Sequence, residues 1–368
     1  MHVIKPERTH HAVIVVGTRP NLVKAAPLVR AAEAMPTLRV TLLHTRQHYD
    51  DALARALQKD LKLPAPWYVE ATNYSLDRKS RLSELQDVIT DALASLAPDV
   101  VIVLGDVDST LAAARAAQQL KLPIAHVEAG LRSGDLNMPE EVNRIEVDQL
   151  SERLYVTEKD GVLNLEREGF AAGKIKLCGN VMIDQLQHIA QRVETPSPEE
   201  FALVTLHRAS LTASRASLTL ALASVARLAE RMPVKWVLHP RVRHALAHHD
   251  LHEAARELTH VELLPPLLYS QFVALMVSAK LIMTDSGGLV VEAAVLGKPC
   301  LVYRTSLEAK SVLRRGTHLL PKSLNPDDVA QAVESLLMRS ALPLDSPLAD
   351  GKAAMRIMQD LTDWLATH

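Results

Sequence analysis

The chain of 368 residues is longer than a typical single domain, so two domains of ordinary size are the first expectation. Hydrophobic residues make up 48% of the sequence and charged residues 23%, which is the balance of a folded globular protein. A net charge of −2 and an aromatic content of 3% offer neither the electrostatic field nor the stacking surface that nucleic acids and anionic membranes attract. Any phosphate that the protein binds must therefore be held locally, by a shaped pocket.

The apolar runs at 13–16, 100–104 and 281–283 are far shorter than the roughly 20 residues that a membrane helix needs. The first residues also lack the apolar stretch of a signal peptide. Cys178 and Cys300 lie far apart among apolar residues, which predicts two buried, inert thiols and neither a disulfide framework nor a metal site. These features favour a cytoplasmic enzyme.

In the first half of the chain, short apolar runs alternate with helical stretches, which predicts a parallel sheet with crossover helices. The predicted strands lie near 12–17, 39–44, 100–104, 123–127, 153–156 and 175–178. The predicted helices lie near 20–34, 80–95, 108–119, 159–168 and 181–193. The polar, proline-bearing segment that begins at Thr195 predicts a domain boundary.

The second half restarts the alternation. Its predicted strands lie near 201–206, 235–239, 260–263, 281–283 and 299–303, and its predicted helices near 214–231, 269–277, 287–296 and 325–338. We therefore expect two Rossmann-like, doubly wound α/β domains that face a cleft, at 1–193 and 199–345. A last helix, within 346–368, is expected to pack back on the first domain. Ligands of such sheets bind beyond the carboxyl ends of the strands.

A glycine turn with basic residues follows the first predicted strand. Gly17 and Arg19 lie in this turn, and Lys24 lies one turn into the next helix. A turn of this kind, with cations that reach back over a helix start, suits an anionic group. The same residues are also common as solvated side chains, so the motif alone leaves both interpretations open.

Acidic residues follow the next two buried strands. Asp108 or Ser109 can cap the helix after the first of them, so capping does not require Asp106. His126 and Glu128 end the following strand, and two residues apart on a strand their side chains are expected to share one face. A carboxylate among apolar neighbours is costly to bury unless it is paired. We therefore expect a function for Asp106 and Glu128.

Further charged residues follow the same strand. Arg132 comes first, and Arg144 closes a segment that begins with Pro139-Glu140-Glu141. Proline followed by two acids is also an ordinary helix start, because proline suits the first turn and acids suit the N-terminus of a helix. That interpretation stays open for Glu140 alone, whereas the whole set favours an active site.

In the second half, a predicted strand runs into Ser286-Gly-Gly and then a helix. Free backbone amides at such a helix start hold a diphosphate. Glu292, one turn into the helix, is placed to accept hydrogen bonds from ribose hydroxyls. Two other strands end in His207-Arg208 and in His239.

Taken in this order, the motifs resemble the UDP-N-acetylglucosamine 2-epimerases, chiefly the non-hydrolysing bacterial type, from about residue 12 to residue 320. The matching stretches are 17–20, 47–50, 105–106, 126–132, 139–144, 179–180, 207–208 and 285–288. The resemblance implies a GT-B-like fold, a UDP-sugar substrate, a homodimer, no metal and no cofactor. It also implies interconversion of UDP-GlcNAc and UDP-ManNAc.

The resemblance implies catalytic roles for Asp106, Glu128 and Glu140, and a catalytic or diphosphate-contacting role for His207. The candidate substrate and nucleotide contacts are Arg19, Lys24, Arg132, Arg144, His239, Ser286, Gly287, Gly288 and Glu292. The family's implied route loses UDP together with the C2 proton to give a glycal, which then adds UDP again. Such a route needs a base, a proton donor on the opposite face and a firmly held diphosphate.

Several positions depart from the family's pattern: Asn21, Arg46, Ala209, Val290, Val291 and Ala309. They lie in motifs near the nucleotide or the sugar, whereas the acids are intact. Three alternatives therefore stay open: a hydrolysing 2-epimerase that releases a free ManNAc-type sugar and UDP, a GT-B glycosyltransferase, and a catalytically silent UDP-sugar-binding paralogue. The spacing around Glu140 is also similar to that of relatives acting on diacetamido uronic acid sugars.

Overall fold

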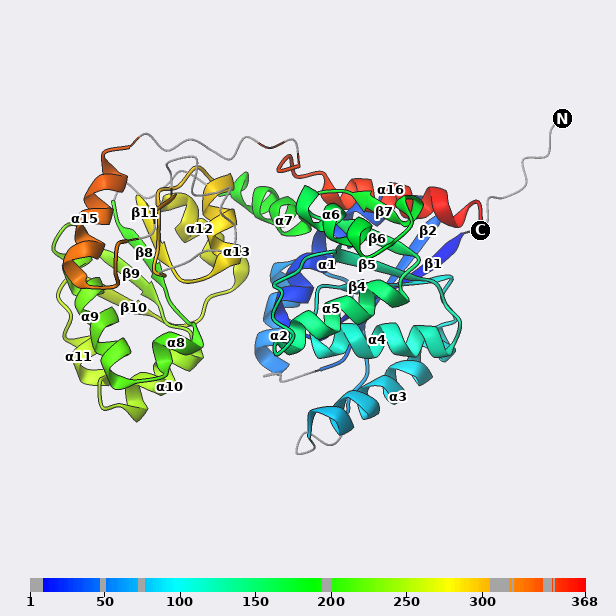
Figure 1. Cartoon of the computed structure of the whole chain (residues 1–368), viewed down its shortest axis with the longest axis horizontal. Helices are drawn as coiled ribbons and strands as arrows, with labels where there is room; N and C mark the ends of the chain where they lie inside the picture. The colour runs from blue at the N-terminus through cyan, green and yellow to red at the C-terminus, as the bar shows by residue number, and fades with distance from the viewer. Residues whose placement is uncertain are drawn as a thin grey trace. The chain divides into compact units, whose positions relative to one another are not determined.

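The computed structural model describes residues 9–46, 51–71, 77–193, 200–304, 318–319, 321–339, 346 and 348–368. The chain divides into two compact units (Figure 1): unit 1 comprises Met1–Gln185 with Pro347–His368, and unit 2 comprises Leu186–Ser346. The division falls inside helix α7 (Val181–Ala190), whereas the proline-bearing segment 194–199, where a boundary is predicted, lies outside the described residues. None of the described helices is long and apolar enough to cross a membrane.

Unit 1 is built on a seven-stranded parallel sheet with the order β3-β2-β1-β4-β5-β6-β7. The strands are β1 (His10–Val16), β2 (Leu38–His44), β3 (Trp67–Tyr68), β4 (Val100–Leu104), β5 (Ile124–Ala129), β6 (Arg153–Val156) and β7 (Ile175–Leu177). The helices between them are α1 (Arg19–Ala32), α2 (Asp51–Asp60), α3 (Arg78–Leu96), α4 (Asp108–Gln119), α5 (Pro139–Leu150), α6 (Lys159–Arg167) and the short η1 (Ala172–Lys174).

Helices cover both faces of this sheet. Val13 and Val15 of β1 pack in one apolar cluster with α3 and α4, whereas α1 contacts β1, β2 and β4. The last helix, α16 (Ala353–Leu365, red in Figure 1), packs on α1. Its first two backbone N–H groups donate to the buried carboxylate of Asp184 at 3.1 and 2.7 Å. An acid at a helix N-terminus satisfies donors that have no partner inside the helix.

Unit 2 contains a six-stranded parallel sheet with the order β10-β9-β8-β11-β12-β13. The strands are β8 (Ala202–Thr205), β9 (Val234–Val237), β10 (Val261–Leu264), β11 (Leu281–Thr284), β12 (Cys300–Val302) and β13 (His318–Leu319). Helices α9 (Arg215–Ala229) and α15 (Pro326–Leu337) pack in one apolar cluster, and α12 (Tyr269–Ser278) and α13 (Gly287–Val295) pack in a second. The remaining helices are α8 (Ala209–Thr212), α10 (Pro240–His248) and α11 (His252–Arg256).

Each sheet has a point where its winding changes direction. In unit 1 this point lies between β1 and β4, and in unit 2 between β8 and β11. In doubly wound sheets, ligands bind outside the carboxyl ends of the strands at this point. The residues that follow these four strands are the candidates from the sequence: Gly17 after β1, Asp106 after β4, His207 after β8 and Ser286 after β11.

The predicted α/β architecture is confirmed, and each predicted strand is present. Both cysteines are free and buried, as predicted. Burial raises the pKa of the Cys178 thiol to about 12 and the pKa of the Cys300 thiol further still. Thiols of this kind are protonated at neutral pH and are therefore poor nucleophiles.

Candidate active site

Asn21 fixes the turn that follows β1. Its Oδ1 accepts a hydrogen bond from the hydroxyl of Thr18 at 2.8 Å and from the Thr18 backbone N–H at 3.3 Å. Its Nδ2 donates to the carbonyl of Leu104, at the end of β4, at 3.1 Å. The amide thus ties the start of α1 to β4 by both accepting and donating, which an ionised glutamate at this position cannot do. This departure from the family's pattern has a structural role in a buried position.

Arg46 lies after β2 with φ of +47°, in the left-handed region where the family's glycine is relaxed. Its guanidinium carbon lies 4.5 Å from the centre of the Tyr68 ring, and its Nη1 lies 3.4 Å from Glu70 Oε2. These two contacts offset part of the cost of the backbone conformation. The rest of this motif, 47–50, lies outside the described residues.

Glu128 pairs with Lys24 of α1, and both side chains are mostly buried. Glu128 has φ of +73°, and the register between β5 and β6 shifts between Val127 and Ala129. This bulge turns Glu128 toward α1 while His126 contacts α5. The expectation that His126 and Glu128 share one face of the strand is therefore wrong, because an irregular residue breaks the alternation that the expectation assumes.

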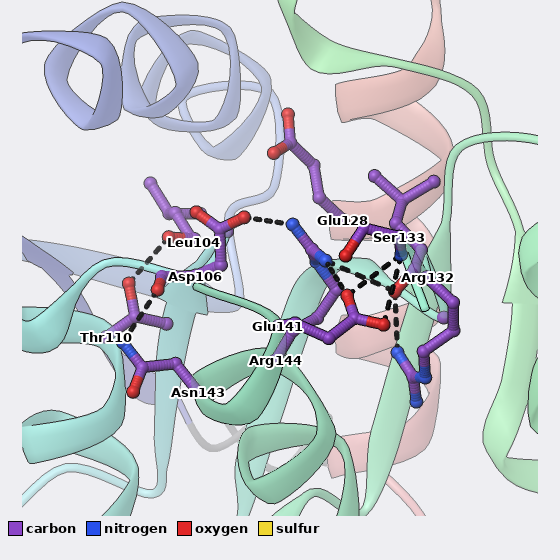
Figure 2. Close-up of polar contacts among 12 residues, drawn as sticks. Leu104, Asp106, Thr110, Glu128, Arg132, Ser133, Glu141, Asn143 and Arg144 are labelled. Atoms are coloured by element: carbon purple, nitrogen blue, oxygen red, sulfur yellow. Dashed lines mark hydrogen bonds and ion pairs between the residues drawn. The ribbon is translucent and has the colours of Figure 1, made fainter. Parts of the chain in front are cut away.

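Asp106 lies just beyond β4, and its carboxylate pairs with Arg144 of α5 (Figure 2). The backbone carbonyl of Asp106 accepts a hydrogen bond from Asn143 Nδ2 at 2.8 Å. The same Arg144 guanidinium donates to Glu141 at 2.9 Å, so one cation bridges two carboxylates. Both the backbone and the side chain of Asp106 are therefore held from α5.

Glu141 anchors the loop that leads into α5. It accepts hydrogen bonds from the backbone N–H groups of Ser133 and Gly134 at 2.9 to 3.0 Å, and its side chain is almost fully buried. Burial by itself would raise the pKa of Glu141, but these donors and Arg144 outweigh it and hold that pKa below its ordinary value. Its neighbour Glu140 is exposed, so the two adjacent acids have different surroundings.

A fully buried carboxylate, Asp148 of α5, was not predicted from the sequence. Its Oδ1 lies 2.6 Å from His126 Nδ1, and its Oδ2 accepts from the Gly130 backbone N–H at 3.1 Å and from Arg132 at 2.8 Å. Burial would raise the pKa of Asp148, but His126 and Arg132 outweigh it and lower that pKa. Arg132 also binds Glu168 through two hydrogen bonds of 2.7 Å. The guanidinium of Arg132 is thus engaged within unit 1.

Asp108 does not cap α4, because Val107 occupies the N-cap position and Asp108 and Ser109 are the first helical residues. The carboxylate of Asp108 instead pairs with Arg78 at 2.6 Å and accepts from Asn143 at 3.1 Å. This small network links α3, α4 and α5 beside Asp106. The prediction that Asp108 or Ser109 caps α4 is therefore wrong, because both residues lie inside the helix and the Asp108 carboxylate pairs with Arg78.

In unit 2, His207 and Arg208 are held by Asp285, which follows β11. The carboxylate of Asp285 accepts from the backbone N–H groups of His207 and Arg208 at 2.8 to 3.0 Å, and it lies 3.2 Å from His207 Nδ1. Burial would raise the pKa of Asp285, but these partners outweigh it and lower that pKa. The ring of His239 lies 5.3 Å from that of His207, and its Nδ1 accepts from the Arg241 N–H at the start of α10.

Helix α13 begins in the Ser-Gly-Gly segment, with Ser286 at the N-cap. Apart from the chain neighbours and the nearby backbone of the helix itself, no described atom lies within 4 Å of the position that a Cβ would take on Gly287 or Gly288. The helix start is therefore open on that side. Glu292 is buried and accepts a hydrogen bond from the Tyr269 hydroxyl at 2.6 Å. Burial raises the pKa of Glu292 to about 7, although the Tyr269 hydrogen bond acts in the opposite direction.

The remaining departures from the family's pattern fall in two surroundings. Val290 and Val291 pack in the apolar cluster of α12 and α13, where the polar side chains of the family's pattern would be buried. Ala209 begins the short α8, and Ala309 lies outside the described residues. Nothing in the structure explains the change at Ala209.

A pocket of about 330 Å³ lies in unit 2 at the same edge of the sheet, lined in part by Arg208, Asp285 and Arg304. Within the described ranges, no group of three or more histidine, cysteine, aspartate or glutamate side chains is arranged to hold a metal ion. The sequence candidates thus form two groups, each at the carboxyl edge of its own sheet.

The sequence model of the family UDP-N-acetylglucosamine 2-epimerase matches residues 30–362. The chain belongs to this family. It is 32% identical over 365 residues to the UDP-N-acetylglucosamine 2-epimerase of Methanocaldococcus jannaschii, covering 95% of this chain and 98% of that protein. It is 33% identical over 357 residues to the UDP-2,3-diacetamido-2,3-dideoxy-D-glucuronate 2-epimerase of Pseudomonas aeruginosa, covering 94% of this chain and 98% of that enzyme.

Solved structures of the 2-epimerase family share the fold. The M. jannaschii enzyme in complex with UDP-GlcNAc and UDP superposes with a TM-score of 0.84 at 31% identity, covering 96% of this chain and 99% of that one. The Neisseria meningitidis enzyme bound to UDP-GlcNAc also gives a TM-score of 0.84, at 26% identity, over 96% of this chain and all of that one. The glycosyltransferase of kitacinnamycin, at 16% identity and a TM-score of 0.57, shares the fold alone.

Glu141 and Glu140 are adjacent in the sequence but differ in burial, so their substitutions are expected to change the stability of the protein by different amounts. Glu141→Gln removes a charged acceptor from three donors and should cost about 1.5–3 kcal/mol of unfolding free energy at neutral pH. Glu140→Gln, at an exposed position, should change stability by less than about 0.5 kcal/mol. Denaturant unfolding of the full chain, followed by a spectroscopic probe placed in unit 1, measures the unfolding free energy of both variants.

The pH dependence gives a second check. The folded-state pKa of Glu141 is depressed below the unfolded-state value of about 4.3. The contribution of ionised Glu141 to the unfolding free energy is therefore fully present above that unfolded-state value, and it is lost as the pH falls through the folded-state pKa. The difference in unfolding free energy between wild type and Glu141→Gln should therefore become smaller as the pH falls below about 4. A difference in unfolding free energy that stays constant with pH would contradict the role of Glu141 as the anchor of this loop. Equal losses of stability in Glu141→Gln and Glu140→Gln would contradict it as well.

Proposed function

We propose that this chain epimerises C2 of a UDP-linked N-acetylamino sugar, interconverting UDP-GlcNAc and UDP-ManNAc or a related pair. The observation that carries the proposal is a pair of carboxylates, Asp106 and Glu128, at the carboxyl edge of the unit 1 sheet, each held by one cation. Membership of the family and the relatives crystallised with UDP-GlcNAc support the same activity.

The chemistry explains why more than one acid is needed. The C2 proton of the sugar is not acidic enough for simple removal at neutral pH, so its loss is coupled to departure of UDP from C1. The C2–H electron pair forms the C1–C2 double bond, and the C1–O electron pair leaves with the β-phosphate. In the return direction, C2 gains a proton on the opposite face and the β-phosphate oxygen attacks C1. The net result is inversion at C2 with nothing consumed.

Unit 1 supplies the proton-transfer groups in this proposal. Asp106, Glu128 and Glu140 are the acids that take the C2 proton and return one to the other face. Lys24 and Arg144 hold two of these carboxylates in fixed positions, which is the preorganisation that proton transfer requires. Arg132, with Asp148 and Glu168, supports the segment that follows Glu128. Arg19, at the start of α1, lies where a helix N-terminus and a cation favour a phosphate group.

Unit 2 supplies the groups for the nucleotide. The open start of α13, at Ser286, Gly287 and Gly288, offers backbone N–H groups to the diphosphate. His207, braced by Asp285 and next to His239, is proposed to contact the leaving diphosphate. Glu292 is proposed to accept from the ribose hydroxyls, with Tyr269 holding its carboxyl group.

The experiment that tests the proposal is proton NMR of the purified protein with UDP-GlcNAc in heavy water. We expect the signals of UDP-ManNAc to appear, with deuterium at C2 in both sugars, because the proton lost from C2 exchanges with solvent. UDP-2,3-diacetamido-2,3-dideoxy-glucuronate is the second substrate to offer, since a relative that is 33% identical is named as a 2-epimerase of this sugar nucleotide.

Other products would identify other activities. Free N-acetylmannosamine with UDP would show that water captures the intermediate, which is the hydrolysing outcome. No deuterium at C2 with either sugar nucleotide, together with tight binding by calorimetry, would contradict the proposal and favour a silent UDP-sugar-binding protein.

The two paired acids are expected to be essential. Asp106→Asn and Glu128→Gln should each lower kcat at least about a hundredfold, the usual scale for removing a general acid or base. Glu146→Gln is the matched control, because Glu146 of α5 also forms an ion pair with an arginine, Arg115 of α4, and both side chains are partly exposed. Near-normal turnover in both acid variants, or an equal loss in the control, would overturn the assignment of Asp106 and Glu128.

The resemblance also implies a homodimer, and the composition and cysteine usage favour a location in the cytoplasm. We propose this assembly as part of the function, and analytical ultracentrifugation of the purified chain tests it. A monomer at all concentrations would contradict it.

A further inference from the structure

His126 has an acceptor at each of its two ring nitrogens. Its Nε2 lies 2.8 Å from the backbone carbonyl oxygen of Gly105, and its Nδ1 lies 2.6 Å from Asp148 Oδ1. The ring is fully buried. The mechanism above assigns no task to this histidine, which lies in β5 with Glu128 and next to β4, the strand that leads to Asp106.

The groups that contact the two ring nitrogens of His126 indicate which of these nitrogens carry a proton. A carbonyl oxygen only accepts, so Nε2 carries a proton. The other carboxylate oxygen of Asp148 already accepts from the Gly130 N–H and from Arg132, two donors that favour an ionised carboxylate. An ionised Asp148 also only accepts, so Nδ1 carries a proton as well.

The charges around the ring agree with this count. Asp148 and Glu168 contribute two negative charges, and Arg132 contributes one positive charge. With a neutral His126 the cluster would carry one net negative charge, shared between the fully buried Asp148 and the partly exposed Glu168. The buried share of that charge is costly in a low-dielectric interior. With a protonated His126 the four charges balance.

We propose that His126 is a buried imidazolium that positions Asp106 for proton transfer by clamping the peptide that links Gly105 to Asp106. The clamp acts at a turn that glycine permits, because Gly105 has φ of +68°. The N–H of Gly105 donates to the carbonyl of Val127 at 3.0 Å, so both the N–H and the carbonyl of Gly105 are held by β5. The positioning role rests on the proposed function, whereas the charge on the ring does not.

The charge is tested directly by ¹⁵N NMR of histidine-labelled wild-type protein at about pH 7.5, where a solvated histidine has lost one ring proton. We expect His126, assigned by its absence from the His126→Gln spectrum, to show both ring nitrogens bonded to hydrogen. One unprotonated ring nitrogen in His126 at this pH would overturn the proposal. No substrate is present, so this result is independent of whether C2 exchange occurs.

The clamp is tested by two amide variants. The side-chain nitrogen of glutamine overlies Nε2 and keeps a donor toward Gly105, whereas that of asparagine overlies Nδ1 and keeps a donor toward Asp148. We expect His126→Asn to lower kcat about a hundredfold, the scale of a misplaced reacting group, and His126→Gln to lower kcat about tenfold or less. KM should change little in both, because the proposed nucleotide contacts lie mainly in unit 2.

His11→Gln is the control for loss of a buried histidine in the same sheet. His11 lies near the start of β1, away from the carboxyl edge, and its Nε2 contacts the Thr41 hydroxyl at 2.8 Å. It should lower the melting temperature without lowering kcat. Equal kcat values for His126→Asn and His126→Gln, or a kcat loss that only follows the fraction of folded protein, would overturn the positioning role. If the wild type catalyses no C2 exchange, the proposed function fails and the NMR result still decides the charge.

Discussion

Four carboxylates at the carboxyl edge of the sheet in unit 1 lie against cations, and the geometry of the candidate site depends on this pairing. Glu128 is held by Lys24, Asp106 and Glu141 share Arg144, and Asp148 lies against Arg132 and His126. Unpaired carboxylates in these largely buried positions would repel one another and would be costly to remove from water. The pairs let several acids converge on a small region and stay in place, which is the condition for proton transfer on two faces of one carbon.

The fold brings these groups together from distant parts of the chain. Parallel strands end at one edge of a sheet, and the change of winding between β1 and β4 opens that edge to a ligand. Helix α5 then reaches across the edge and supplies Arg144 and Asp148 from successive turns of one face, together with the neighbouring Asn143. Unit 2 repeats the arrangement between β8 and β11 with a helix N-terminus in place of the acids. In the proposed function, one architecture thus serves two tasks, which are acid–base chemistry and nucleotide binding.

The predictable part of the structure was the part with strong periodicity. Buried parallel strands appear as apolar runs, and residues that end such runs, including Asp106 and Ser286, can be named without a structure. The two-residue strands β3 and β13 are too short to leave such a pattern. The bulge at Glu128 was missed because strand alternation assumes a regular backbone. Asp148 was missed because its buried position follows from packing, although its spacing of seven from Glu141 places both on one helix face.

In the proposed reaction, the C1–O bond of the sugar nucleotide breaks and re-forms while the sugar stays bound. Positional isotope exchange tests it most directly, with ¹⁸O placed in the bridge between C1 and the β-phosphorus of UDP-GlcNAc. Breaking the C1–O bond frees the diphosphate to rotate, so we expect ³¹P NMR to find the label spread to the non-bridging oxygens of recovered UDP-sugar. Epimerisation at C2 with the label retained in the bridge would contradict this route, because the C1–O bond would then have stayed intact.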